Sequence, residues 1–484
     1  MTASNRPAAL IAARIAMLPA RGFIGKLIAT IALGGCFEFY DMFLTAYIAP
    51  SLIRSHIFVL HTESFFDIHG IAAFVAALFA GMFVGAGLLG GLADRFGRRA
   101  VFYWSLLIYS ACTFIMALQT TPEWVVFWRF LAMVGVGLEQ VVIDTYVSEF
   151  VPASKRGRAF GLTQAICFTA VPVVAVLSWI LVPHTILGLD GWRIVTIIGS
   201  LGALIVWFVR RWMPESPIWL EKVGRHGEAE QTMAEIERSA GVAAASRAGA
   251  PASLDVQNGP VGAPSPELSF SARWRLMWSA PLRGLLIVMC IFNVCVTVGY
   301  YGFASWVPTL LVAKGMTVTK SLEYSVIMAL AAPLAPLLSM LVADRMERKW
   351  QVCLTCAMCA VLGCLFGAAS SAAVVMLLGF LLTLNNGWMS SCYHTYQAEV
   401  FPSVVRGQAV GFVYCWSRFA GIFCSFIVAW LLGLYGPLGV FVFITANMLV
   451  IVVLIGWFGP RTNHDSNDVN VQGLAYEAKI AMNR

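Results

Sequence analysis

The stretch GLADRFGRR, residues 91–99, lies between two long apolar runs and returns as LVADRMERK at residues 341–349. A second stretch, TYVSEFVPASKRG at 145–157, returns as TYQAEVFPSVVRG at 395–407. Both pairs are separated by 250 residues, so one offset relates the two halves of the chain. Two motifs repeated at a single offset indicate a fold built from two similar halves.

The composition is that of a membrane protein with many spans. Of the 484 residues, 59% are hydrophobic and only 12% are charged, whereas soluble proteins have about 25% charged residues. About twelve apolar stretches reach the length of ~20 residues that crosses a bilayer. We expect an all-α fold with spans near 26–50, 70–92, 100–119, 123–146, 159–183, 193–212, 283–312, 323–343, 350–370, 372–395, 407–434 and 437–459.

A long polar region separates the sixth and seventh spans. It contains a charged helical pattern near 225–240, followed by a linker rich in Ala, Gly, Pro and Ser. The predicted organisation is a tail at 1–25, a six-helix bundle at 26–212, a central loop at 213–280, a second bundle at 281–459 and a tail at 460–484.

Lysine and arginine predict the orientation. With both termini in the cytoplasm, 26 of the 32 cations fall in cytoplasmic segments, four fall outside and two, Arg129 and Arg418, lie within spans. This asymmetry follows the positive-inside rule. The net charge of +7 is thereby explained without a nucleic-acid partner.

Three motifs carry a resemblance to the major facilitator superfamily. GLADRFGRR resembles its loop between helices 2 and 3, RFLAMVGVG (129–137) resembles its fourth-helix Arg-Gly motif, and PESPIWL (214–220) is similar to the PESPRWL of sugar porters and related metabolite:proton symporters. The resemblance covers residues 26–459 and implies a transporter that works by alternating access. Ile218 stands where sugar porters have Arg, and the seventh span lacks their Gln-Gln pattern. EFYD (38–41) and YGFASWVPTLL (301–311) look more like organic-acid:proton symporters.

The resemblance implies a conformational latch at the cytoplasmic loops. Asp94 would face the N-terminus of the eleventh helix, where the helix dipole favours an anion, and Arg98 would pair with Glu149 in the outward-open state. Glu347 replaces the loop glycine in the second copy, which weakens it. The alternative is plain positive-inside charge. The latch candidates are Gly91, Asp94, Arg95, Gly97, Arg98, Arg99, Glu149, Arg156, Asp344, Arg345, Arg348, Glu399 and Arg406.

Asp41 and Arg129 are expected to lie at similar depth. Asp41 is roughly 22 Å along the first span from Lys26, in the outer third, and Arg129 is roughly 9 Å from the outer end of the fourth span. The resemblance implies that these two helices are adjacent, so the two charges can pair. Because Arg stays charged, Asp41 would be the residue that takes up the proton. A static structural pair is the alternative.

Glu38 and Arg418 are predicted near the midplane. Intramembrane charges are functional candidates by default. Arg418 is interpreted either as the ligand of a substrate carboxylate or as the neutralising partner of Glu38, and the proton-coupling roles of Glu38 and Asp41 could be exchanged. Glu139 and Asp144 form either an inner relay or the polar lining of a vestibule.

Further polar and aromatic side chains within the spans are candidate substrate contacts. For the aromatic residues of the seventh span, an interfacial belt is the alternative. The candidates beside Arg418 are Tyr40, Gln164, Asn293, Tyr300, Tyr301, Asn385, Asn386 and Trp388.

The predicted function is proton-coupled symport of a small organic acid in the inner membrane, and aromatic carboxylates are among the candidate substrates. No G-x-x-x-x-G-K-[ST] motif is present, so ATP-driven transport is not expected. The 12 cysteines lie in apolar segments, so we expect neither disulfides nor a metal site, and we expect no cofactor and a monomer. A sugar, polyol or organic-cation porter is the alternative among transporters. A membrane receptor is the alternative outside them, and no catalytic constellation indicates an enzyme.

Overall fold

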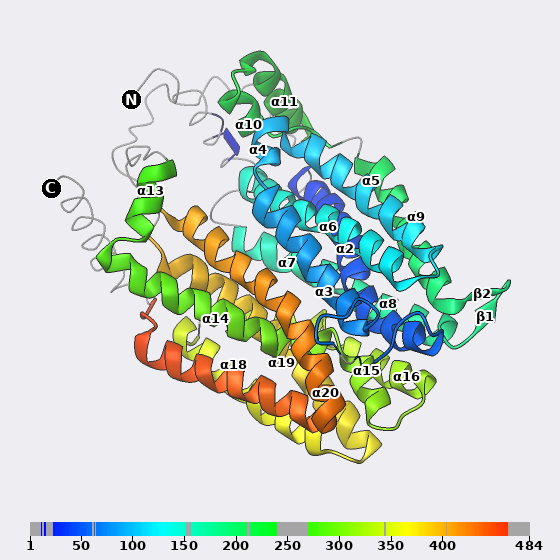
Figure 1. Ribbon diagram of the computed structural model, residues 1–484. Coiled ribbons are helices and arrows are strands. Elements are labelled where there is room, and N and C mark those ends of the chain that lie inside the picture. The colour runs from blue at the N-terminus through cyan, green and yellow to red at the C-terminus, as the bar shows by residue number, and fades with distance from the viewer. Residues whose placement is uncertain are drawn as a thin grey trace.

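The computed structural model describes residues 11, 14–15, 23–60, 62, 64–151, 156–210, 213–239, 270–342, 345–402 and 404–462. These residues form two bundles of long helices joined by a short helical region (Figure 1). The first bundle contains α2 (Phe23–Arg54), α3 (Ile71–Met82), η2 (Phe83–Leu88), α4 (Leu92–Phe96), α5 (Arg98–Ala117), α6 (Pro122–Phe150), α7 (Arg156–Phe168), α8 (Ala170–Leu181), a hairpin of β1 (Thr185–Ile186) and β2 (Leu189–Asp190), and α9 (Gly191–Arg210).

The second bundle follows the central region. The central helices are α10 (Pro217–Lys222), α11 (His226–Ser239) and α13 (Phe270–Met277). The second bundle then contains α14 (Ala280–Ala304), α15 (Val307–Ala313), α16 (Val318–Ala329), α17 (Leu334–Val342), α18 (Arg348–Ala368), α19 (Ala372–Val400) and α20 (Arg406–Phe458).

Eleven helical stretches of the described residues are long and apolar enough to cross a membrane. The last of them, α20, has 53 residues, which corresponds to ~80 Å, more than twice the ~30 Å core of a bilayer. Its backbone leaves helical geometry at Gly436 (φ 66°, ψ −166°), directly before Pro437. Figure 1 shows α20 turning back on itself, so it supplies two crossings.

Several predicted spans are not single helices. The second continues from α3 into the π-helical turn η2, the fifth is divided between α7 and α8, and the eighth between α16 and α17. Pro333, which has no backbone N–H to donate, lies in the break before α17. The fourth and tenth spans run further than expected, to Phe150 and Val400. The first six residues of each repeated motif, at 145–150 and 395–400, are therefore helical.

The charged pattern near 225–240 forms helix α11, as predicted. The N-terminal segment packs on this helix. Arg14 pairs with Glu230 at 2.6 Å and with Glu237 at 2.8 Å, and Ile11 and Ile15 are buried in the same cluster. The linker that follows α11 lies outside the described residues.

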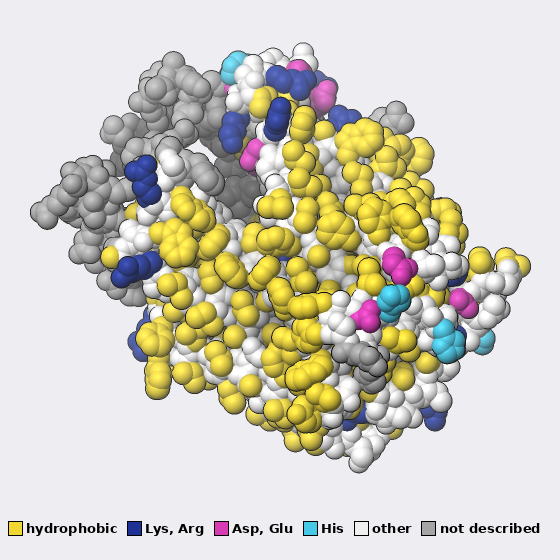
Figure 2. All heavy atoms as spheres, in the orientation of Figure 1, with side chains coloured by type: hydrophobic (Ala, Val, Ile, Leu, Met, Phe, Trp, Pro, Cys, Tyr) yellow, Lys and Arg dark blue, Asp and Glu magenta, His cyan; other side chains and the backbone are white. Residues whose placement is uncertain are grey.

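The two bundles contact each other chiefly where α3 packs on α20, α2 on α15, α8 on α16 and α7 on α17, with smaller contacts of η2 with α20 and of α2 with α16. Within the first bundle, close packing depends on Gly85, because a Cβ there would lie 2.2 Å from the carbonyl oxygen of Val134 in α6. The surface between the two ends is mostly hydrophobic (Figure 2), as expected for a protein surrounded by lipid.

Candidate functional site

Asp41 and Arg129 form the buried ion pair expected from their depths. Arg129 Nη1 lies 2.9 Å from Asp41 Oδ1, and Thr113 Oγ1 donates to Asp41 Oδ2 at 3.0 Å. Arg129 Nη2 also donates to the Asp41 carbonyl and to the Thr45 hydroxyl. Asp41 is 3% exposed and Arg129 is 0% exposed. Both carboxylate oxygens therefore have donors, which offsets the cost of burying the charges.

Arg418 is also buried, but its hydrogen-bond partners are uncharged. Its guanidinium donates to Tyr301 Oη at 3.0 Å, to Tyr414 Oη at 2.8 Å and to Gln140 Oε1 at 2.9 Å. The bond to Gln140 joins α20 of the second bundle to α6 of the first. Among the described residues, no carboxylate forms an ion pair with Arg418, so the expected alternative of an Arg418–Glu38 pair is not formed. The Nε atom of Arg418 is buried and has no hydrogen-bond partner among the residues that the structure describes.

A cavity of about 40 Å³ lies between the two bundles. Its lining is mostly aromatic and aliphatic and includes Phe43, Tyr47, Phe168 and Tyr300. Its polar members besides the tyrosines are Ser325, Thr383 and Asn386. The Tyr300 ring lies 4.8 Å from that of Tyr301, which accepts the Arg418 hydrogen bond. Two adjacent tyrosines thus connect the cavity to the guanidinium. Small-molecule pockets usually enclose about 300–1,000 Å³, so the bundles must separate to admit a substrate.

Three other candidate side chains make hydrogen bonds within their own bundle. Tyr40 donates to a carbonyl of α9 at 2.8 Å, Asn385 donates to a carbonyl of α18 at 2.9 Å, and Asn293 donates to Gln397 Oε1 at 2.9 Å. The polar groups of these residues hold neighbouring helices together in this structure.

The remaining candidates lie elsewhere in the bundles. Gln164 and Trp388 are half-buried and are not part of the lining described for the central cavity. Glu38 and Glu139 are fully buried in the first bundle. The side chain of Asp144 lies outside the described residues.

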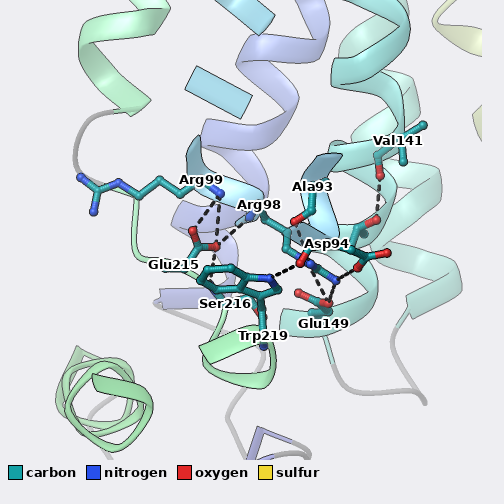
Figure 3. Close-up of polar contacts among 10 residues, drawn as sticks. Ala93, Asp94, Arg98, Arg99, Val141, Glu149, Glu215, Ser216 and Trp219 are labelled. Atoms are coloured by element: carbon teal, nitrogen blue, oxygen red, sulfur yellow. Dashed lines mark hydrogen bonds and ion pairs between the residues drawn. The ribbon is translucent and has the colours of Figure 1, made fainter. Parts of the chain in front are cut away.

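Arg98 is the centre of a polar network at one end of the first bundle (Figure 3). Its Nη2 lies 2.7 Å from Asp94 Oδ1 and 3.1 Å from Glu149 Oε1, and its Nη1 donates to the Ala93 carbonyl at 2.9 Å. The contact with Glu149 is the one that the resemblance implies. That Asp94 faces the N-terminus of the eleventh helix stays a prediction. Among the described residues its carboxylate does not contact the start of α20; it is largely exposed and pairs with Arg98 four residues away.

Glu215 and Trp219 belong to the same network, although neither was expected from the sequence to be a site residue. The Glu215 carboxylate accepts from the backbone N–H groups of Arg98 and Arg99 at 3.1–3.2 Å, and so caps the first turn of α5 (Figure 3). Trp219 Nε1 donates to the Asp94 carbonyl at 2.9 Å. Burial raises the pKa of Glu215, against the lowering effect of these N–H donors. The Pro-Glu-Ser-Pro motif at residues 214–217 is the sequence feature from which a role for Glu215 could have been predicted.

Gly97 is required by the turn into α5. Its φ of 97° is one that L-residues rarely adopt, and a Cβ there would lie 2.5 Å from Glu215 Oε2. Gly91 has no such role, because a Cβ at that position would meet open space.

The second copy of the network is reduced. Arg348 Nε lies 2.5 Å from Glu399 Oε1, which matches the Arg98–Glu149 contact at the repeat offset. Arg406 Nε donates to the Phe401 carbonyl at 3.2 Å. Asp344 and the side chain of Arg156 lie outside the described residues. Arg95, Arg99 and Arg345 are exposed.

Comparison with known proteins agrees with this architecture. Residues 27–468 match the family described as "Sugar (and other) transporter". The putative metabolite transport protein YyaJ of Bacillus subtilis is 30% identical over 465 residues, which cover 95% of this chain and 97% of the relative. The niacin transporter NiaP of Acinetobacter baylyi is 31% identical over 455 residues, which cover 93% and 97%.

Solved structures show the same fold. The partially occluded inward-open conformation of the xylose transporter XylE from E. coli has a TM-score of 0.71 and 18% identity, with coverage of 91% of this chain and 98% of the other. The repeated motifs, the two bundles and the family match lead to one conclusion: the chain belongs to the sugar (and other) transporter family of the major facilitator superfamily and is a multi-pass membrane transporter.

Proposed function

We propose that this transporter is a proton-driven symporter of a small aromatic carboxylate in the inner membrane, with Arg418 as the counter-ion of the carboxylate. One observation carries the proposal: Arg418 is a buried guanidinium whose described partners are all neutral. A buried charge without an opposite charge costs several kcal/mol. An anionic substrate beside Arg418 would offset that cost, and guanidinium geometry suits a carboxylate.

The surroundings of Arg418 support an aromatic substrate. The adjacent cavity is lined by the rings of Phe43, Phe168 and Tyr300. Aromatic pairs contribute roughly 0.5–1.5 kcal/mol beyond the area that they bury. A planar ring in the widened cavity, with its carboxylate directed past the two tyrosines, would reach the guanidinium.

A relative supports the same substrate class. The niacin transporter NiaP is 31% identical to this chain over nearly its full length. Niacin is a pyridine ring with one carboxylate, which is the chemistry that the cavity and Arg418 would together recognise.

Asp41 supplies the coupling in this proposal. Low dielectric favours the neutral form of a carboxylic acid, and a nearby guanidinium favours the charged form. A shift of α2 against α6 would change the distance between Asp41 and Arg129. It would thereby change the balance between the neutral and the charged form of Asp41. Arg129 stays charged at all physiological pH values, so Asp41 takes up and releases the proton.

Binding of a carboxylate and of its amide isostere tests the role of Arg418. We expect purified protein to bind nicotinate at least about tenfold more tightly than nicotinamide, equivalent to ~1.4 kcal/mol. Arg418→Gln should remove this preference, and the exposed control Arg275→Ala should keep it. An unchanged preference in Arg418→Gln would overturn the assignment. Binding of xylose with no preference for the carboxylate would instead support a sugar or polyol porter.

A further inference from the structure

A groove of about 750 Å³ lies near the outer ends of α3, α6 and α20, away from the central cavity. Its floor is one face of α3, where alanines recur at helical spacing. Several of its wall side chains are exposed, Trp124 by 54% and Phe127 by 44%, so the groove opens toward the lipid. The floor is Ala73, Ala76, Ala77 and Ala80, and the walls include Phe66, Trp124, Phe127, Phe130, Ile422 and Phe426.

The groove has the depth of one leaflet. Ala80 is nine residues along α3 from Ile71, or roughly 14 Å, and Phe130 is eight residues along α6 from Pro122, or roughly 12 Å. Half of a bilayer core of ~30 Å is about 15 Å. The distribution of Lys and Arg places this end of the helices on the outer side, so the groove faces the outer leaflet.

The rim of the groove at the membrane surface is acidic. Asp67 and Glu123 both line it, and His69 lies between them, 3.0 Å from Asp67 Oδ1 and 3.2 Å from Glu123 Oε1. Hydrogen bonds from the backbone and ring of His69 lower the pKa of Asp67, and an aspartate with an ordinary or lowered pKa is charged at neutral pH. Two carboxylates at headgroup level favour a cationic group there and disfavour an anionic one.

We propose that this groove binds one outer-leaflet phospholipid, with an acyl chain along the alanine floor of α3 and an ammonium headgroup at Asp67 and Glu123. The site is separate from Arg418 and does not depend on the proposed substrate. A second copy of the chain is the rival occupant, because small residues allow close helix packing in membranes. A copy seated here would bury two carboxylates, Asp67 and Glu123, with the single imidazole of His69 between them, and burial of incompletely compensated charge is costly.

The groove exists only while the outer ends of the two bundles are together. Phe66, from the first bundle, lies 6.2 Å from the ring of Phe423 and 5.1 Å from that of Phe426 in α20. Phe66, Phe426 and Ile422 all contribute to its walls. Outward opening would separate these walls, so a bound lipid favours the arrangement that is closed on the outer side.

Native mass spectrometry of the purified full chain, with phosphatidylethanolamine or phosphatidylglycerol added, tests this site. The wild type should retain phosphatidylethanolamine in preference to phosphatidylglycerol by about fivefold, the size expected for exposed ion pairs. Ala80→Phe, which fills the deep end, should remove the bound lipid, and Ala373→Phe, on an exposed surface of α19, should not.

The double variant Asp67→Asn/Glu123→Gln separates the headgroup contact from folding, because both side chains are at the surface. It should keep one bound lipid but lose the preference between the two headgroups. Equal retention of the two lipids by the wild type would overturn the proposal. So would undiminished lipid in Ala80→Phe, or a dimer that Ala80→Phe disrupts.

Discussion

Asp41 and Arg418 are buried charges in different surroundings. Asp41 has a donor on each carboxylate oxygen, including the guanidinium of Arg129. Arg418 has only neutral partners among the described residues, and one of them, Gln140, belongs to the opposite bundle. The first arrangement suits a carboxylate whose protonation changes when its guanidinium partner moves away. The second suits a guanidinium that binds an anionic substrate.

Asp41→Asn should abolish proton-driven accumulation of substrate but retain exchange of substrate across the membrane. Asparagine keeps the shape of the side chain and can still accept from Arg129, but it cannot take up a proton. Counterflow and gradient-driven uptake in proteoliposomes measure the two activities separately. Glu38→Gln is the matched variant.

Accumulation by Asp41→Asn together with its loss in Glu38→Gln would exchange the two roles. The double variant Asp41→Asn/Arg129→Gln controls for misfolding, because it removes the uncompensated guanidinium that the single variant leaves.

Gln140→Glu should weaken binding of an anionic substrate by at least about tenfold, equivalent to ~1.4 kcal/mol. The new carboxylate would replace an amide oxygen that lies 2.9 Å from Arg418 Nη2, and would compete with the substrate for the guanidinium. Gln140→Ala should bind at least as well as the wild type, because it only removes a competitor. Equilibrium binding of nicotinate to both variants checks this, and equal affinity of Gln140→Glu and wild type would contradict it.

From the sequence, the spanning helices are predicted in approximate extent, but not in their breaks or their capping contacts. Hydrophobic length predicts which segments span, because about 20 apolar residues are needed to cross the core. It does not predict breaks inside a span, such as that between α7 and α8, since both pieces are apolar. It also misses Glu215, whose role depends on packing the segment before α10 against the first turn of α5. A carboxylate's partners are set by tertiary contacts that no local pattern records.

Glu215→Ala should lower the thermal stability of the protein, because two N–H groups at the start of α5 lose their acceptor. Loss of a helix cap costs roughly 0.5–2 kcal/mol. Glu228→Ala is the matched control, since Glu228 pairs with Arg225 at the surface, where ion pairs contribute little. Thermal unfolding of the two variants in one detergent makes the comparison, and an equal effect would contradict the capping role.

Across the whole molecule, the 250-residue repeat relates the Arg–Glu contacts at the loop ends of the two bundles, but it does not relate the buried charges. At the offset of 250 residues, Arg98–Glu149 corresponds to Arg348–Glu399, and both contacts are formed. Asp41 and Arg129 correspond instead to Ile291 and Gly379. Arg418 corresponds to Phe168, which lines the central cavity. The repeated residues therefore predict the scaffold, and the unrepeated charges mark the candidate site. This comparison of the two halves does not identify Gln140, which is uncharged, or Glu215, which lies outside the repeated motifs.

Arg98→Ala should slow turnover by more than it weakens substrate binding, because Arg98 joins Asp94 and Glu149, whereas the described hydrogen bonds of Arg418 go to other residues. Arg275→Ala is the control, since Arg275 is exposed on α13 and is not one of the latch candidates. Exchange rates and equilibrium affinity, measured on the same preparations, distinguish the two effects. Unchanged turnover with weakened binding would contradict a latch.

Uptake of labelled nicotinate into proteoliposomes, with and without an inward proton gradient, tests proton-coupled carboxylate transport most directly. We expect accumulation above equilibrium only with the gradient, its collapse on addition of a protonophore, and no gradient-driven accumulation of nicotinamide. Nicotinate uptake that ignores the gradient, or gradient-driven accumulation of xylose with none of any aromatic carboxylate, would contradict the account.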